Sequence, residues 1–272
     1  MALAAVLATL AAAVAVEAQF RRRGGGRSFG NAVVATPDDV VGGFQFCRIA
    51  FNQDFRGDPN SGNWTVDWPR ADINLSIRLG ELTRANVSLD ANDEPLPLLM
   101  RLTDDVMFQC PFIMMTEVGS ASISHEEAAR LREYLLKGGF LWADDFWGSE
   151  AWDWWVGQLN KVLPVAEYPI IDLPPSHGLF SSQFQISKVP QIASINFWAG
   201  SGGGTSERYE DSAVAHARAV VDQHGNIMVL MTHNTDLGDS FEREADDPQY
   251  FLQMSVPGYA FGVNTLLYAL TH

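Results

Sequence analysis

A strand–helix–strand pattern near the middle of the chain constrains the fold more than any other feature. The apolar run PFIMMTEV (111–118) is typical of a buried parallel strand. Ser124 and Glu127 have the spacing of a capping box, which begins a helix, and Gly138 follows that helix. FLWAD (140–144) is then the next strand. This unit predicts two parallel strands joined by a right-handed crossover.

An earlier strand is predicted at FQFCRIAF (44–51), where Arg48 interrupts an otherwise apolar run. A buried arginine in an acidic chain is expected to pair with a carboxylate. Asp67 and Asp144 are both candidates for that partner, and the sequence does not decide between them.

A helix is predicted after the loop that follows this strand. Asp67 stands in an N-cap position, Pro69 fits the first turn, and the helix continues to about Thr83. Its apolar residues have helical spacing and predict one buried face: Ile73, Ile77 and Leu79.

A second helix is predicted over residues 150–162. Four apolar residues lie along one side of it and are interpreted as core: Trp152, Trp155, Val156 and Leu159. Trp147 and Trp154 lie off that stripe. We expect these two indoles to be exposed, where they would suit stacking on a sugar or contact with a partner.

The C-terminal third continues the alternation of strands and helices. AVAHARAVVD and NIMVLMTHN flank QHG, which predicts an antiparallel hairpin, and GYAFGVNTLLYALTH predicts a final helix. The whole pattern predicts an α/β fold with a mostly parallel sheet.

The N-terminus predicts export. Residues 1–18 are nearly uncharged and end in a small-x-small pattern, as in a signal peptide; the alternative is an uncleaved anchor in the inner membrane. Residues 19–43 are rich in Arg and Gly and predict a flexible leader. We expect the remainder, residues 44–272, to form a single domain. We expect a periplasmic or secreted protein, with membrane contact only through an uncleaved N-terminus.

Charge and cysteine content restrict the partners. Beyond residue 43 the chain has 14 Lys and Arg against 30 Asp and Glu, a net charge of −16, so nucleic acid is not an expected partner. Cys47 and Cys110 form no CxxC motif. We expect two buried free thiols, with one disulfide as the alternative in an oxidising compartment.

Several segments resemble the domain of unknown function 4159 family. They are FQFCRIAF, WTVDWPRADINL, EEAARLREYLLKGGFLWADD, LPPSHGLF, HNTDLGD and GVNTLLYAL, and they span essentially all of residues 44–272. The resemblance implies a class I glutamine amidotransferase-like fold, a flavodoxin-like three-layer sandwich, in an exported bacterial protein. Family members commonly carry a Gly-His-Gly-like turn where this chain has Glu117-Val118-Gly119-Ser120, so any role of that histidine is lost or passes to Glu117.

The cysteines do not fit glutamine hydrolysis. A class I amidotransferase needs a cysteine on a tight strand-to-helix elbow, activated by a histidine. Cys47 lies inside a strand pattern and Cys110 precedes a proline, and neither has elbow glycines. The corresponding strand ends instead in Asp144 and Asp145, so no Cys-His-Glu triad is recognisable.

Asp144 and Asp145 stand where open α/β sheets bind ligands, at the carboxyl end of a strand. Adjacent strand residues point to opposite sides, so we expect one to face the cleft and the other to cap a turn or helix. If the loop with Asn234, Asp236 and Asp239 lies beside them, Asp144, Asp236 and Asp239 could ligate Ca²⁺ or Mg²⁺. The alternative is that both pairs of aspartates only close turns.

His177 and His233 are the histidines expected to reach this edge, and no HxH or HExxH motif indicates zinc. Two classes of function remain. We favour a non-catalytic binding or scaffold module of the envelope that binds a protein or glycan and requires no cofactor. Its expected ligand-binding residues are Arg48, Glu117, Asp144, Asp145, Trp147, Asn234 and Asp236. The alternative is a hydrolase using Asp144 or Asp145 with His177, His233 or a divalent cation.

Overall fold

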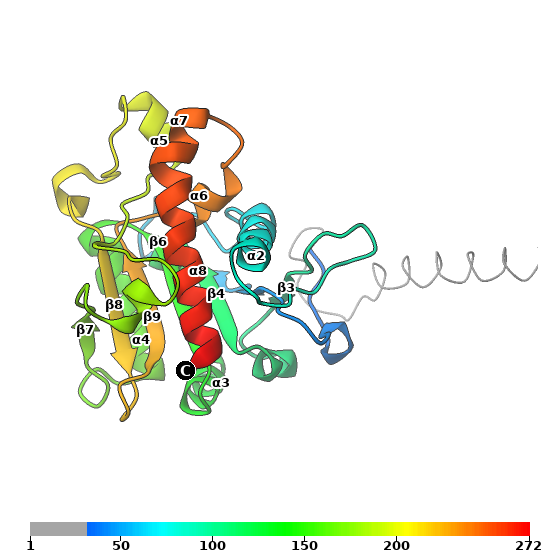
Figure 1. Ribbon diagram of the computed structural model, residues 1–272. Coiled ribbons are helices and arrows are strands. Elements are labelled where there is room, and N and C mark those ends of the chain that lie inside the picture. Colours follow the sequence, from blue (N-terminus) through cyan, green and yellow to red (C-terminus); the bar gives the residue numbers. More distant parts are fainter. Residues whose placement is uncertain (1–31) are drawn as a thin grey trace, which may run out of the picture. The chain divides into compact units, whose positions relative to one another are not determined.

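A seven-stranded sheet forms the centre of the computed structural model, which describes residues 32–272 (Figure 1). The strands lie in the order β3 (Leu98–Met100), β1 (Cys47–Ile49), β4 (Phe112–Thr116), β6 (Phe140–Phe146), β9 (Ile227–His233), β8 (His216–Val221) and β7 (Ile170–Asp172). The first five are parallel, and β8 is antiparallel to both of its neighbours. The predicted α/β class with a mostly parallel sheet is therefore confirmed.

The order of the parallel strands is flavodoxin-like. The chain adds β3 on one side of β1 and then crosses to add β4, β6 and β9 on the other side. In such sheets, ligands bind outside the carboxyl ends of the strands near the point where the order reverses. That edge carries the loops after β1, β4, β6 and β9.

Helices cover both faces of the sheet (Figure 1). The core on one face joins Phe112 and Trp142 to apolar side chains of α2 (Arg70–Leu82) and α8 (Val256–Thr271). Alternate strand residues such as Leu141 point to the other face, where α3 (His125–Leu136) packs against α4 (Gly148–Val162). Shorter elements are α5 (Ile195–Gly200), α6 (Leu237–Glu242), α7 (Pro248–Tyr250) and a separate antiparallel pair, β2 (Asn52–Gln53) with β5 (Ala121–Ser122).

The predicted strand–helix–strand unit is present as β4, α3 and β6. The Ser124 hydroxyl accepts from the Glu127 backbone N–H, and the Glu127 carboxylate accepts from the Ser124 N–H at 2.8 Å. Gly138 follows α3 with φ +92°, a conformation that favours glycine. The predicted hairpin is β8–β9, and the predicted C-terminal helix is α8.

The predicted pairing of Arg48 was wrong. Arg48 and Asp72 of α2 are both fully buried, and the Arg48 Nε donates to Asp72 Oδ2 at 3.2 Å. The partner of Arg48 is therefore a residue of α2 and is neither Asp67 nor Asp144. Because Asp72 occupies the inner face of α2, the predicted apolar stripe is shifted: Ile77 is exposed, and Leu75 packs inward beside Leu79.

The expectation of free thiols was also wrong, because Cys47 on β1 and Cys110 before β4 form a disulfide. Two of the tryptophans differ from expectation too. Trp147 is only 5% exposed, and the half-buried Trp154 donates its Nε1 hydrogen to the Ala121 carbonyl at 2.7 Å. Neither indole is a freely exposed stacking surface.

The compact unit begins at Ala35, whose backbone N–H donates to the Leu99 carbonyl at 2.7 Å. Part of the expected leader, from residue 35 to residue 43, is thus in contact with the domain. The expected signal peptide or anchor at residues 1–18 lies outside the described residues. Among residues 32–272, no helix is both long enough and apolar enough to cross a membrane.

Candidate functional site

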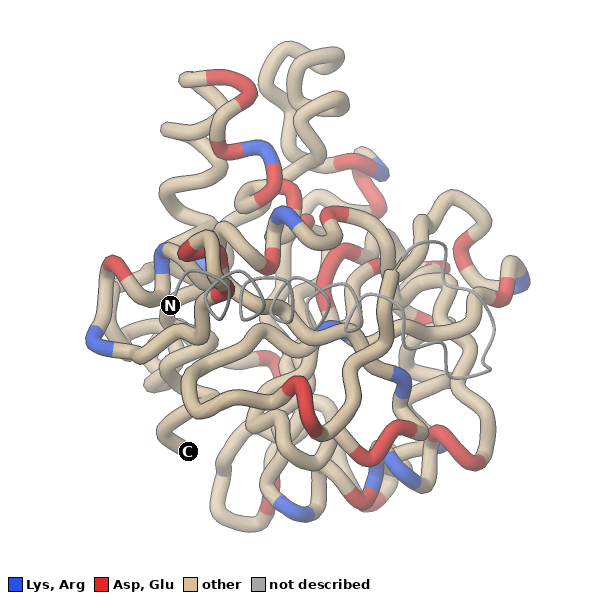
Figure 2. Tube along the Cα trace, turned by 90° about the vertical axis from the view of Figure 1, so that its right-hand side faces the viewer, with Lys and Arg blue, Asp and Glu red and all other residues tan. Residues whose placement is uncertain are grey.

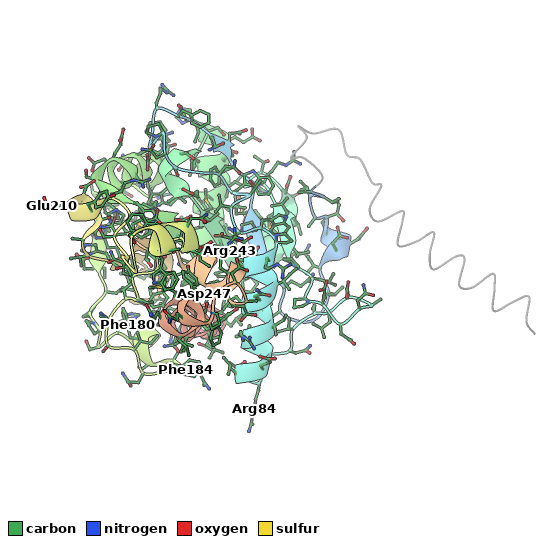
Figure 3. The ribbon with its side chains drawn as sticks, turned by 90° about the horizontal axis from the view of Figure 1, so that it is seen from above. Arg84, Phe180, Phe184, Glu210, Arg243 and Asp247 are labelled. Carbon is green, nitrogen blue, oxygen red and sulfur yellow. A yellow bond between two sulfur atoms is a disulfide. The ribbon has the colours of Figure 1, made fainter. Side chains whose placement is uncertain are left out.

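An acidic cavity of about 460 Å³ opens at the carboxyl edge of the sheet. Eight acidic side chains border it: Asp58, Asp67, Glu117, Asp145, Glu207, Asp236, Asp239 and Glu242. Among residues 32–272, only two basic ones border it, Arg208 and Arg243. Acidic residues also outnumber basic ones along the described chain (Figure 2). Figure 3 looks down on this edge of the sheet, with Arg243 labelled. The cavity therefore favours ligands that carry positive charge.

The backbone around the cavity adopts an unusual conformation at four positions. Asp67, Glu117, Asp145 and Asn234 have φ between 55° and 63°, the left-handed region. Each such non-glycine residue costs roughly 1–3 kcal/mol, and such residues cluster at functional sites. Three of them follow or end the parallel strands β4, β6 and β9, so the strain is concentrated at the ligand-binding edge.

Asp144 and Asp145 have different roles, as their adjacent positions predict. Asp144 is fully buried and accepts hydrogen bonds from the Thr232 hydroxyl and from the backbone N–H groups of Leu237 (3.0 Å) and Gly238 (3.3 Å). Burial raises its pKa to about 7. Asp144 thus holds β6 to β9 and to the start of α6, and it does not border the cavity.

Asp145 turns the other way and borders the cavity. The register of β6 against β9 shifts between Ala143 and Phe146, so Asp145 is released from regular pairing. Its Oδ1 accepts a hydrogen bond from the Trp147 indole Nε1 at 3.0 Å. Trp147, predicted as an exposed ligand-binding residue, therefore acts from a buried position by orienting a carboxylate.

Asp67, Asp145 and Asp236 form the inner carboxylates of the cavity. One oxygen from each lies within 4.8 Å of the others, and the three side chains are between 4% and 6% exposed. Burial is the main cause that raises the pKa of each well above its ordinary value; the charges of neighbouring carboxylates add to it. Among the described residues, no basic side chain forms an ion pair with any of the three.

Asp67, Asp239 and Glu242 form a second, outer set that shares Asp67 with the first. This set has a basic partner, because the Arg243 Nε lies 2.8 Å from Glu242 Oε2 and 3.4 Å from Asp239 Oδ1. Asp239 also accepts a hydrogen bond from the Ile195 backbone N–H at 2.6 Å. The outer set is therefore largely compensated within the protein.

Glu117 borders the same cavity from the end of β4. Its Oε2 accepts a hydrogen bond from the Ser61 hydroxyl at 2.6 Å, and burial raises its pKa to about 7. Asn234 has a structural role instead: its side chain accepts from the Gly148 N–H at 2.8 Å and donates to the Val214 carbonyl at 2.9 Å.

The structure does not bring either candidate histidine to the inner carboxylates. His233 lies on the β9 side, with Nε2 2.9 Å from the Gly148 carbonyl and its ring 5.1 Å from Trp152; burial lowers its pKa to about 4. His177 packs at 5.5 Å against the ring of Tyr268. Tyr268 in turn contacts the first residues of β6 and β9, so His177 lies at the opposite, amino edge of the sheet.

Of the three predicted metal ligands, the structure leaves Asp236 in the inner set and Asp239 in the outer set, while Asp144 is fully used by protein hydrogen bonds. Sequence reasoning missed Asp67, which it interpreted as a helix cap; α2 begins at Arg70, with Pro69 at the N-cap position. No local signal indicates the role of Asp67, because its neighbour Gly238, where an added Cβ would lie 2.2 Å from Asp67 Oδ2, is distant in the sequence.

The family model described as "Domain of unknown function (DUF4159)" matches residues 46–270. The chain belongs to this family. The match includes β1 through nearly all of α8 and every acidic residue that borders the cavity. No curated protein matches the chain. The family thus supports the resemblance found in the sequence without naming a ligand.

Proposed function

We propose that this domain is a binding module of the bacterial cell envelope and that its acidic cavity holds a positively charged ligand. The observation that carries the proposal is the inner set of three buried carboxylates, which have no basic partner among residues 32–272. Burying unpaired charge is costly, so a folded domain that keeps it at a ligand-binding edge is expected to use it.

Export is supported by the Cys47–Cys110 disulfide, because such bonds persist in oxidising compartments. It is also supported by the signal-like pattern of residues 1–18. The flavodoxin-like strand order is compatible with a relationship to the class I glutamine amidotransferases. Because both cysteines are joined to each other, neither is available as the thiolate nucleophile of that chemistry.

A thermal melt read by tryptophan fluorescence tests the binding role. The full-length chain would be heated in EDTA with spermidine, a Lys-rich peptide or a cationic oligosaccharide, and in parallel with inorganic cations. A ligand at about 100 times its Kd adds about 2.7 kcal/mol and raises the midpoint by several degrees.

The shift should be lost in Asp145→Asn and retained in Asp153→Asn, a matched change of an exposed carboxylate on α4. If no organic or inorganic cation shifts the wild-type midpoint, the proposed function is wrong.

A cation-assisted hydrolase is the second candidate, favoured by Glu117. A carboxyl group with a pKa of about 7 beside a cavity has the protonation behaviour of a general acid or base at neutral pH. Turnover of chromogenic phosphate, acyl or glycosyl esters that disappears in Glu117→Gln but not in Asp153→Asn would establish it. No turnover by the wild-type chain would leave Glu117 as a ligand-binding residue.

A further inference from the structure

We propose that Asp67, Asp145 and Asp236 together ligate one hard divalent cation, Ca²⁺ or Mg²⁺, in the acidic cavity. This inference rests on the proposed binding function and names the ligand of that same cavity. The three residues come from distant parts of the chain: the loop before α2, the end of β6 and the loop before α6.

Asp67 gives the observation that distinguishes this site from an ordinary acidic patch. Asp67 is 6% exposed and borders the cavity, and its Oδ2 has no hydrogen-bond partner among residues 32–272. A buried carboxylate oxygen without a partner costs free energy comparable to a lost hydrogen bond or more. A cation between the three carboxylates would supply the missing partner.

Glycine at position 238 makes room for this carboxylate. A Cβ at that position would lie 2.2 Å from Asp67 Oδ2 and 3.1 Å from its Cγ. Asp67 can therefore approach the start of α6 only because residue 238 has no side chain.

The other two carboxylates are held in place with oxygens to spare. Asp145 Oδ1 accepts from the Trp147 indole, and Asp236 Oδ1 accepts from the Asp239 backbone N–H at 2.8 Å. The second oxygen of each has no hydrogen bond among those found in the described residues. Fixed orientation of the ligating oxygens is what a preorganised cation site requires.

The ligand chemistry selects a hard cation. All three side chains offer only carboxylate oxygens, which suit Ca²⁺, Mg²⁺ and Mn²⁺, whereas zinc and copper sites favour His and Cys ligands. His177 and His233 lie elsewhere, and both cysteines are in the disulfide. The remaining coordination positions would be filled by water from the cavity.

The inner set is a better site than the outer set because of the surrounding charges. Arg243 already pairs with Asp239 and Glu242. The basic group whose charge acts on Asp67 is Arg48, and it is paired with Asp72. Neighbouring acidic groups, among them Glu117 and Glu207, add to the raised pKa of Asp145.

The site can be tested with Tb³⁺, which takes oxygen ligands as Ca²⁺ does and emits when a nearby indole is excited. Trp147 contacts Asp145 and places an indole beside the proposed site. The full-length chain would be stripped with EDTA and titrated with Tb³⁺, after which Ca²⁺, Mg²⁺ and Zn²⁺ would compete. Isothermal titration calorimetry with each metal alone would give the affinities.

We expect sensitised Tb³⁺ emission that Ca²⁺ or Mg²⁺ displaces. Asp67→Asn and Asp236→Asn should each weaken binding by roughly 100-fold, since a ligand is lost. Asp153→Asn, a matched change of an exposed carboxylate on α4, should retain wild-type affinity, and Glu242→Gln in the outer set should weaken binding less than either inner-set change. Asn at position 236 can still accept from the Asp239 N–H, so the variant should fold, and its melt in EDTA checks this.

Three results would overturn the inference. They are the absence of Ca²⁺ and Mg²⁺ binding to the wild-type chain, tighter binding of Zn²⁺ than of both, and equal loss of binding in Glu242→Gln and Asp236→Asn. If an organic cation still stabilises the protein when Ca²⁺ and Mg²⁺ do not bind, the cation site fails but the proposed binding function stands. If neither binds, both fail.

Discussion

Two groups of buried charge in this domain are organised in opposite ways. Arg48 and Asp72 are both fully buried, form two hydrogen bonds and have no net charge as a pair. Asp67, Asp145 and Asp236 are almost as deeply buried, but each of their near neighbours in the set is another carboxylate. The charge of the first group is balanced within the protein, although Arg48 Nη1 has no hydrogen-bond partner among the described residues, whereas the charge of the second group is not balanced.

The difference separates structural from functional burial of charge. A buried ion pair roughly balances its desolvation cost by its own attraction, so it can join β1 to α2 without a ligand. The three inner carboxylates have no such balance within the described part of the chain, so the domain is expected to protonate them or bind a cation. The predictions below test this contrast, from the largest expected effect to the smallest.

Asp72→Ala should have the largest effect on stability. It leaves the Arg48 guanidinium buried without its partner, which costs about 3–5 kcal/mol. Urea unfolding of the wild-type and variant chains measures this. A double variant, Arg48→Met with Asp72→Leu, should recover most of the loss, because it removes both charges together. A loss below about 1 kcal/mol in Asp72→Ala would contradict the structural role of the pair.

The pH dependence of the metal-free protein should show the inner carboxylates directly. Their pKa values are raised in the folded state, so the folded protein binds protons more tightly than the unfolded chain. Stability in EDTA should therefore fall as pH rises from about 4 through neutral pH, by up to about 1.4 kcal/mol per pH unit for each group. Asp144 and Glu117, with pKa values of about 7, contribute in the same direction.

Asp145→Asn should reduce this slope, because it removes one titrating group, and Asp153→Asn should leave it unchanged. Urea unfolding in EDTA at pH 5 and pH 8 is the measurement. Ca²⁺ or Mg²⁺ should also reduce the slope, since a bound cation stabilises the ionised carboxylates. Stability that rises with pH over this range would mean that the inner carboxylates are compensated after all.

Gly238→Ala should separate ligand binding from folding. The new methyl group would lie on Asp67 Oδ2, the far end of a side chain that can move away. We expect cation affinity to fall about tenfold, while stability in EDTA changes by less than about 1 kcal/mol. Gly157→Ala is the control, because nothing lies within 4 Å of its added Cβ. Unchanged affinity in Gly238→Ala would remove Asp67 from the site.

Much of the fold was predictable because its signals are local. The capping box at Ser124 and Glu127 and the apolar runs of the strands on either side of it depend on residues only a few positions apart. The same holds for Asp144 and Asp145: strand geometry alone implies that one faces the cleft and the other is used in the protein. Which of the two faces the cleft depends on the register shift in β6, which only the paired strands reveal.

The candidate site was predicted only in part because its residues meet across long separations. From the local sequence, Asp67 is predicted to cap a helix. Capping patterns involve only nearby residues, so they do not reveal its spatial neighbours at positions 145, 236 and 238. The left-handed conformation of Asp67 and Glu117 could not be predicted from the sequence, because neither residue is a glycine. Likewise, the choice between free thiols and a disulfide depends on how closely β1 approaches the segment before β4, which spacing alone does not fix.

Trp147→Phe should have the smallest effect, because it tests a single hydrogen bond that the protein donates to one inner carboxylate, Asp145. Phenylalanine keeps an aromatic ring at this buried position but removes the Nε1 donor that lies 3.0 Å from Asp145 Oδ1. Loss of one hydrogen bond to a carboxylate should weaken cation binding by roughly 1–2 kcal/mol, or about tenfold. Sensitised Tb³⁺ emission should fall far more than the affinity, because the indole itself is gone. Trp154→Phe, whose indole bonds to Ala121 outside the cavity, should change neither quantity. If emission survives in Trp147→Phe and disappears in Trp154→Phe, the bound cation lies nearer to Trp154 than to Trp147, and the inner carboxylates do not hold it.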